Sequence, residues 1–292
     1  MIQSDCNIAM ASDDGYSVHL CALLYSILEN RKDTYRKFNF FILDNDISKK
    51  NKKLCKSIID KYPNCEIEFH DIAESIQRYA SMCHMHLTVN VFSRLYLAEL
   101  LPGIDKIIYI DVDTCVLTDI SKLFDLNIEN YYAGVVYDYI MSVFVNKRVR
   151  APRKFRSVSS GAYILRYLNL PINPTKYFQA GVLLLNLNKI KSDNAFEQAK
   201  SLLSKRHYWF LEQDTLNIVF RDNILFLDPR WNVVNVENDI IDALHEPQKS
   251  QFVFSQSDPY IVHFAGDKTK PWSNTNAKYS EYYFKYRELI KL

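Results

Sequence analysis

A run of apolar residues of strand length, 107–110, ends abruptly in the motif Asp111-Val112-Asp113. Side chains alternate between the two faces of a strand, so carboxylates at positions i and i+2 share a face if the strand continues. If the backbone turns instead, both can converge on one point. Paired carboxylate oxygens suit Mg²⁺ or Mn²⁺, which keep coordination positions open for substrate phosphates. Because ligands bind beyond the carboxyl ends of strands in open α/β sheets, the motif predicts metal-assisted handling of a phosphorylated substrate.

Strand-like and helix-like segments alternate through the first part of the chain. Apolar runs of strand length are separated by segments whose apolar residues recur at helical spacing. This alternation is typical of a mostly parallel sheet covered by helices on both faces, so we expect an α/β fold. The predicted strands are 7–11, 38–43, 66–69 and 106–110, and the predicted helices are 17–29, 48–62 (with Ser48 as N-cap) and 91–101.

The second part of the chain is less regular. Residues 180–187 are predicted to form a strand buried on both faces, because their apolar residues do not alternate with polar ones. No acidic residue occurs in 139–178, which we interpret as a basic, inserted and partly mobile loop region, and 278–292 is predicted to be a basic, aromatic C-terminal helix. The other predicted elements are strands 131–137, 224–227 and 260–264 and helices 189–204 and 211–220.

Composition excludes several classes of protein. A formal net charge of +2 gives no global field that would attract nucleic acid. Hydrophobic content of 48% and charged content of 24% are typical of an ordinary folded protein. No apolar run approaches the roughly 20 residues that span a bilayer, and no secretory signal is visible. The six cysteines form no CxxC pair and several lie in apolar contexts, so we expect reduced thiols in a cytoplasmic protein.

A cluster late in the chain offers further ligands. His263 ends a strand-like run, and a neutral imidazole is a good third ligand for Mn²⁺ beside carboxylates. Gly266 lets the backbone approach a ligand closely, and Lys268 or Lys270 can neutralise phosphate charge as it develops. Taken singly, these residues fit a buried structural histidine and a surface lysine better than a site.

Two other polar clusters are ambiguous on their own. Residues 11–16 follow the first strand, where short polar side chains can hold the base and ribose of a nucleotide. The cluster lacks the glycine-rich dinucleotide pattern, which disfavours NAD. N-capping by Ser12 or Asp13 is the simpler explanation when the cluster is taken alone. Residues 212–214 open a predicted helix, where acidic side chains are favoured by the helix dipole.

Taken together and in this order, the motifs resemble those of family 8 glycosyltransferases. These retaining enzymes include bacterial lipopolysaccharide galactosyl- and glucosyltransferases and glycogenin. The resemblance covers nearly the whole chain. The matching stretches are 7–16, 92–97, 107–114, 177–186, 212–217 and 263–266, with Lys270-Pro271-Trp272.

The resemblance implies a GT-A fold, that is, a single α/β domain over residues 1–292 with a Rossmann-like nucleotide-binding sheet flanked by helices. It also implies a UDP-sugar donor and a divalent cation, Mn²⁺ or Mg²⁺. The implied metal ligands are Asp111, Asp113 and His263. In the implied donor site, Ala11, Asp13 and Gly15 bind the uridine, Gly266 and Lys270 bind the diphosphate, and Arg94 and Asp111 hold the sugar. Val112, Gln179 and Ala180 complete this site. The implied catalytic residues, near the sugar and the acceptor, are Asp138, Glu212 and Gln213.

The chain departs from the family pattern at a few positions. Gln179 and Glu212 stand where the family often has Asn and Asp, and each adds a methylene facing the sugar. The hexose, galactose or glucose, therefore stays open. Gly15 replaces a frequent Asn, which weakens one donor contact. The span from Gly266 to the Lys-Pro-Trp motif is one residue longer than in similar bacterial enzymes, so Lys268 competes with Lys270 for the diphosphate.

The expected reaction is transfer of a hexose, with retention, to a saccharide or glycolipid acceptor in bacterial surface glycan or lipopolysaccharide synthesis. Gln213 would lie near the reacting carbon, but an amide is a poor nucleophile, so we expect attack by the acceptor from the leaving-group face. The basic segments 139–178 and 278–292 suggest peripheral contact with an anionic membrane. A solvated loop and a packed terminal helix are the alternative, and no nucleic acid partner is expected.

Two competing functions remain open at this point. A phosphatase of the haloacid dehalogenase type also uses a strand followed by Asp-x-Asp, in which the first Asp attacks phosphorus. About a third of the chain precedes the motif here, and that function would leave residues 263–272 unused. The second alternative is a non-catalytic protein that binds a sugar nucleotide.

Overall fold

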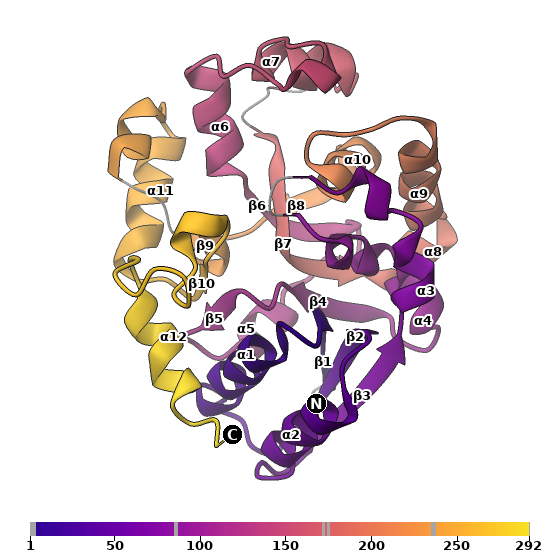
Figure 1. Cartoon of the computed structure of the whole chain (residues 1–292), viewed down its shortest axis with the longest axis vertical. Coiled ribbons are helices and arrows are strands. Elements are labelled where there is room, and N and C mark those ends of the chain that lie inside the picture. The colour runs from indigo at the N-terminus through magenta and orange to yellow at the C-terminus, as the bar shows by residue number, and fades with distance from the viewer. Residues whose placement is uncertain (1–3, 85–86, 171–172, 174–175, 235–237, 292) are drawn as a thin grey trace.

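The computed structural model describes residues 4–84, 87–170, 173, 176–234 and 238–291. Its centre is a seven-stranded sheet in the order β3-β2-β1-β4-β7-β6-β8 (Figure 1). The strands are β1 (Cys6–Asp13), β2 (Phe38–Asn45), β3 (Cys65–Asp71), β4 (Lys106–Ile110), β6 (Ala133–Tyr137), β7 (Phe178–Asn186) and β8 (Ile224–Phe226). All seven strands were predicted from the sequence, with end points that differ by a few residues.

Strand direction divides this sheet in two. β3, β2, β1 and β4 are parallel, as are β6 and β8, whereas β7 runs antiparallel to both of its neighbours. The expectation of a mostly parallel sheet is therefore confirmed, with one reversed strand near the centre. Because β7 is reversed, its first residues lie beside the carboxyl end of β4, where Asp111 donates its backbone N–H to the Gly181 carbonyl oxygen at 2.8 Å.

Both faces of the sheet are buried. Successive residues of β1 enter different hydrophobic clusters, with Ile8 and Met10 on one face and Ala9 and Ala11 on the other. Burying each large aliphatic side chain contributes about 1.5–3 kcal/mol, so a strand that is apolar throughout is stabilised only between two layers. The helices on the first face are α1 (Ser17–Glu29), α2 (Lys49–Ile59) and α12 (Ser280–Arg287), and those on the second are α4 (Leu97–Leu100), α8 (Leu187–Ser192), α9 (Ala195–Lys205) and α10 (Leu211–Phe220).

A small sheet joins the end of the chain to the middle. It contains β5 (Thr114–Val116), β9 (Val233–Val234) and β10 (Ile261–His263) in the order β5-β10-β9. β10 is antiparallel to β5, with His263 opposite Thr114, and Phe264 donates its N–H to the Asp113 carbonyl at 2.9 Å. Only β10 was predicted. This sheet brings a late imidazole next to the Asp-x-Asp turn.

Three sequence-based predictions of local structure are wrong. The predicted helix 91–101 is a 3₁₀ helix, η2 (Val89–Tyr96), that leads into the short α4. Five consecutive residues of η2 are buried, including the polar Ser93 and Arg94, so the segment is enclosed by the protein and does not cover its surface as a regular amphipathic helix would. The predicted helix 189–204 is broken into α8 and α9 at Asn194, which has a left-handed backbone with φ of 52°.

The third wrong prediction is the loop over 139–178. The described part is largely helical, because Asp138 caps a new helix by accepting the Met141 N–H at 2.8 Å. The elements are α6 (Tyr139–Asn146), η3 (Arg153–Phe155), α7 (Ser160–Ala162) and the π-helical turn η4 (Tyr163–Tyr167). The rest of this stretch lies partly outside the described residues.

The remaining helices are short connections. They are α3 (Ala73–Gln77), η1 (Ala80–Met82), α5 (Ser121–Phe124), η6 (Pro229–Asn232), η7 (Asn238–Ala243), α11 (Gln248–Ser257) and η8 (Asp267–Thr269). In the described part of the chain, no helix has the length and apolar character needed to cross a membrane. The six cysteines are free thiols. The predicted C-terminal helix is present as the shorter α12, whose residues from Tyr282 to Arg287 are all aromatic or basic.

Candidate active site

The two acids of the Asp-x-Asp turn and His263 meet at one point. β4 ends at Ile110, the backbone turns through Asp111 and Asp113, and β10 ends at His263. One carboxylate oxygen from each acid and one ring nitrogen lie within 4.8 Å of one another. Among the described residues, this is the one group of three or more His, Cys, Asp and Glu that is close enough to hold a metal ion. The convergence expected from the sequence is therefore found.

The donor set fits a divalent cation such as Mn²⁺. Two carboxylates supply hard oxygen ligands, and an imidazole nitrogen adds a borderline one. His263 is 2% exposed, and its Nε2 lies 3.4 Å from Asp113 Oδ1 while its Nδ1 is bonded to Asn232. One ring nitrogen thus faces the carboxylates and the other is occupied within the protein, which is the usual arrangement of a metal-binding histidine.

Gly181 leaves the space that these ligands occupy. A Cβ at this position would clash with the His263 ring and would lie 2.8 Å from Asp111 Oδ2. Any larger residue would have to displace two of the three metal-ligand candidates, so the glycine at the start of β7 is a steric requirement of the cluster.

Cations balance the charge of the acids. Lys270, which is 8% exposed, forms an ion pair with Asp113, and Arg94 Nη2 lies 2.8 Å from Asp111 Oδ1. Burial alone would raise the pKa of Asp113, but Lys270 and His263 hold it well below its usual range. Burial and the neighbouring Asp113 raise the pKa of Asp111, against the lowering effect of Arg94.

Arg94 is a buried side chain that contacts several parts of the site. It is 1% exposed, it donates to the Ala180 carbonyl and, at 3.1 Å, to the Val91 carbonyl, and its guanidinium lies over the Tyr109 ring. Its Nε also lies 3.6 Å from Glu212, and burial raises the pKa of that carboxyl to about 8. Arg94 therefore orients Asp111 from the side away from the cavity, and Glu212, whose pKa is raised by burial, contacts Arg94.

Gln213 and Asp138 form a fixed pair. Gln213 accepts the Ala180 N–H through Oε1 at 2.9 Å and donates through Nε2 to Asp138 Oδ2 at 2.9 Å. Burial raises the pKa of Asp138, whose other oxygen caps α6. A backbone N–H can only donate, so the amide of Gln213 has a defined orientation, with its NH₂ group toward Asp138.

A cavity of about 690 Å³ lies in front of these residues. Its lining combines polar residues, which include the metal-ligand candidates, with many apolar ones. Most of the residues predicted from the sequence line it: Ala11, Asp111, Val112, Asp113, Asp138, Gln179, Gln213, His263, Gly266 and both Lys268 and Lys270. Five predicted residues are not among the described residues that line it: Asp13, Gly15, Arg94, Ala180 and Glu212.

Asp13 and Ala180 contribute through contacts behind the cavity. Asp13 accepts hydrogen bonds from the Tyr16 N–H at 3.0 Å and from Asn90 Nδ2 at 2.8 Å, so it connects the two segments that carry these cavity-lining residues. Ala180 supplies the carbonyl for Arg94 and the N–H for Gln213. Both are supporting residues in this geometry, as are Arg94 and Glu212.

Sequence reasoning missed several residues of the site. Asn232 accepts a hydrogen bond from His263, and it lies outside the stretches that resemble the family; Gly181, which makes room for His263, lies within the stretch 177–186 but was given no role there. The apolar wall of the cavity was missed because its residues come from four separate segments of the chain, none of which carries a motif for them. That wall consists of Leu87, Val91, Ile140, Phe144, Val149, Pro152, Trp209, Phe210 and Val234, with Arg150 among them.

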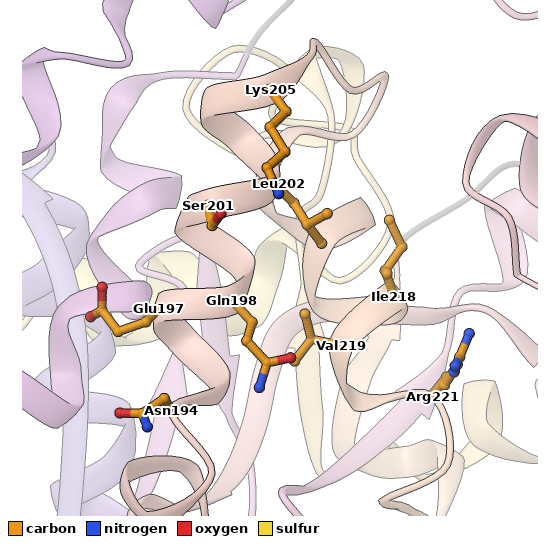
Figure 2. A pocket seen from close by; sticks show the side chains of 9 residues that line it. All are labelled: Asn194, Glu197, Gln198, Ser201, Leu202, Lys205, Ile218, Val219 and Arg221. Carbon is orange, nitrogen blue, oxygen red and sulfur yellow. The ribbon is translucent and has the colours of Figure 1, made fainter.

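A second cavity, of about 600 Å³, lies between α9 and α10 (Figure 2). Its lining mixes charged, amide and aliphatic side chains: Asn194, Glu197, Gln198, Ser201, Leu202, Lys205, Ile218, Val219 and Arg221. Of the ionised groups there, Glu197 is paired with Lys200. None of the metal-ligand candidates found in the described residues lies there, so we assign the active site to the first cavity.

Comparison with known proteins identifies the family to which the chain belongs. Residues 7–276 match the model of glycosyl transferase family 8. A putative glycosyltransferase of Haemophilus influenzae is 29% identical over 237 residues, which are 80% of this chain and 65% of that protein. General stress protein A of Bacillus subtilis is 29% identical over 296 residues, which are 98% of this chain and 94% of that protein.

Among solved structures, the bifunctional glycosyltransferase WbbM superposes with a TM-score of 0.87 at 26% identity. The match covers 98% of this chain and 50% of WbbM, so this chain corresponds to about half of that protein. Similarity extends over both halves of the sheet and over the small sheet that carries His263. The chain belongs to glycosyl transferase family 8 and has a GT-A fold.

Proposed function

We propose that the protein is a metal-dependent, retaining hexosyltransferase. It transfers glucose or galactose from a UDP-sugar to a saccharide or glycolipid acceptor, in the synthesis of a bacterial surface glycan such as lipopolysaccharide. The observation that carries the proposal is the meeting of Asp111, Asp113 and His263 at the end of β4, inside a cavity large enough for a nucleotide sugar. The family assignment argues against the phosphatase alternative.

The donor lies along the polar part of the cavity in this proposal. Ala11 and Tyr16 line it at the end of β1, where the uridine would bind. Gly266, with φ of 93°, and the two lysines of the following segment would contact the diphosphate. Lys270 is already directed to the metal-ligand acids, whereas Lys268 is exposed, so we assign the diphosphate to Lys270.

Mn²⁺, or Mg²⁺, would be held by Asp111, Asp113 and His263 and would stabilise the charge that develops on the departing diphosphate. Lys270 adds a fixed positive charge at the same place. Arg94 pairs with Asp111, and Gly181 leaves room for Asp111 and His263. These two ligands are therefore in position before the donor binds.

The hydrogen bonds of Gln213 support attack from the leaving-group face. Its amide oxygen accepts the Ala180 N–H, and its NH₂ group is directed to Asp138, so the oxygen is already engaged and is a weak nucleophile. Asp138 and Gln213 then position hydroxyl groups of the sugar and acceptor. A glycosyl–enzyme adduct on Gln213, sought by mass spectrometry after rapid quenching, would contradict this assignment.

The acceptor binds along the apolar wall in this proposal. Phe144 and Trp209 stack with ring centroids 5.8 Å apart, and sugar rings present apolar faces to such aromatic surfaces.

Around Arg150 at the edge of the wall, the exposed cations Lys147, Arg148, Arg153, Lys154 and Arg156 form no ion pair with another described residue.

These cations, with α12, would support peripheral contact with the anionic inner face of a cell membrane. Co-sedimentation with vesicles tests this contact. Binding should rise with the fraction of anionic lipid and fall with salt, and it should weaken when Lys154 and Arg156 are both changed to Gln. Binding that ignores lipid charge and salt would contradict it.

Release of UDP tests the proposed function as a whole. UDP-glucose and UDP-galactose are each incubated with the protein and MnCl₂, with EDTA as the control, and p-nitrophenyl phosphate serves as a generic phosphate ester. We expect metal-dependent UDP release from at least one donor and no hydrolysis of the ester. Ester hydrolysis without UDP release would favour a phosphatase, and donor-dependent thermal stabilisation without turnover would favour a non-catalytic binding protein.

A further inference from the structure

We infer that Asn232 is a positioning residue that selects the tautomer of His263, and that Gln179 in turn fixes the orientation of Asn232. The inference rests on the proposed metal site but not on the identity of the donor or acceptor. It assigns a role to two side chains that lie beside the cluster, one of which no sequence pattern singled out.

The hydrogen-bond chain begins at a backbone group whose role is fixed. The Gly181 N–H lies 2.6 Å from Gln179 Oε1, and a backbone N–H can only donate. The oxygen of the Gln179 amide must therefore face Gly181, because its NH₂ group in that place would set two donors against each other.

The same oxygen determines which way Asn232 points. The Asn232 Nδ2 lies 2.5 Å from Gln179 Oε1, so its NH₂ group must face Gln179 and donate to it. This leaves Asn232 Oδ1 toward His263, where it lies 3.0 Å from Nδ1. Asn232 is 1% exposed, so water has little access to take over either contact.

The tautomer of His263 follows from this orientation. An amide oxygen can only accept, so Nδ1 must carry the proton, and in the neutral ring Nε2 then has a free lone pair. Nε2 is the nitrogen that lies 3.4 Å from Asp113 Oδ1, on the side of the carboxylates. The chain of amides therefore keeps the proton of the neutral ring on Nδ1, which makes Nε2 the nitrogen that can bind a metal.

Gly181 connects this chain to the other ligand. Its carbonyl accepts the Asp111 N–H at 2.8 Å, and its own N–H begins the chain that ends at His263. The peptide group after Gly181 thus orients Asp111, and the peptide group before it begins the chain that orients His263. The missing side chain of Gly181 provides the space for both ligands.

The tautomer can be measured without metal or turnover. In metal-free protein labelled with ¹⁵N-histidine, and at a pH where the ring is neutral, NMR should show His263 protonated at Nδ1 and unprotonated at Nε2. In Asn232→Leu, which removes both amide contacts at similar volume, this preference should be lost. A neutral His263 ring with its proton on Nε2 in the unsubstituted protein would overturn the inference, whether or not the variant folds.

Binding of Mn²⁺ in the presence of UDP provides the second measurement. We expect Asn232→Leu to weaken Mn²⁺ binding by about 10–100-fold, the usual effect of removing a partner of a metal-binding histidine. Asn232→Asp keeps an oxygen toward Nδ1, so it should retain the tautomer and lose less affinity. Asn30→Leu is the matched control, because Asn30 donates to the Val116 carbonyl and to Tyr286 without contacting a metal ligand.

Unchanged Mn²⁺ affinity in Asn232→Leu, or an equal loss in Asn30→Leu, would overturn the inference. Failure of the proposed function looks different. A protein with the Nδ1-protonated tautomer and Asn232-dependent Mn²⁺ binding, but with no UDP release from any UDP-sugar, would leave the positioning role intact and remove the transferase proposal.

Discussion

The four parallel strands and the reversed strand β7 contribute to the site in different ways. Each parallel strand ends at or next to an aspartate, namely Asp13, Asp44, Asp71 and Asp111. The first three accept nearby backbone N–H groups, from Tyr16, Ile47 and Ala73. Only Asp111 lies opposite the start of β7, where Gly181 orients it and makes room for His263.

This difference shows what turns a strand-end acid into a metal ligand. An aspartate after a strand has a local use as a cap of the next turn, and three of the four follow it. Asp111 differs because later parts of the chain, β7 and β10, bring a glycine and an imidazole to the same edge. The function of the motif is set by its distant partners.

The largest difference is expected between variants that remove one or the other kind of strand-end acid. Asp111→Ala removes a metal ligand and should lower the rate of UDP release by on the order of 10²-fold or more. Asp71→Ala, at the end of β3, removes only the contact to the Ala73 N–H and should leave the rate within about twofold while lowering the melting temperature slightly. Equal rates in the two variants would erase the distinction between these acids.

A smaller effect is expected from filling the space at β7. Gly181→Ala places a methyl group against His263 and Asp111, so we expect Mn²⁺ affinity to fall by about tenfold or more, as for other changes that misorient metal ligands. Gly103→Ala is the control, because a Cβ there meets no atom within 4 Å. Isothermal titration with Mn²⁺ and UDP compares the two. If Gly181→Ala binds Mn²⁺ as the unsubstituted protein does, the close approach of β7 is unimportant for the cluster.

The smallest effect concerns stability and pH in the region of α10. Burial raises the pKa of Glu212 from 4.5 to about 8, so the folded state favours the protonated acid. This contribution to stability is fully present below pH 4.5 and is lost as pH rises through about 8. Glu212→Gln removes the titration, so the decrease in melting temperature between pH 5 and pH 9 should be smaller in the variant. An unchanged decrease would show that Glu212 is ionised in the fold.

The parallel half of the fold could be predicted from sequence because its signals are local. The predicted helix 17–29 and strand 106–110 have the same bounds as α1 and β4, and Ser48 is the N-cap of α2 as expected. Periodicity and capping suffice where each strand is followed by a covering helix. The reversal of β7 could not be predicted, since a strand buried on both faces carries no mark of its direction.

The metal-ligand candidates of the site could also be predicted from sequence, but the residues that support them could not. Asp111, Asp113 and His263 were identified from residue type and from the resemblance, and the structure brings them together. Asn232 and the apolar wall depend on packing between segments distant in sequence, so local pattern carries no signal for them. The loop predicted over 139–178 was wrong because a single cap at Asp138 starts a helix in a segment that lacks acidic residues.

The central claim is that one cation is bound jointly by the turn after β4 and by the end of β10. Electron paramagnetic resonance of Mn²⁺ titrated into the protein with UDP tests it most directly, with Asp113→Ala and His263→Ala measured beside the unsubstituted protein. We predict one bound Mn²⁺ per chain and a large loss of binding in each variant separately. Unchanged Mn²⁺ binding in His263→Ala, with loss in Asp113→Ala alone, would contradict a site shared between the two segments.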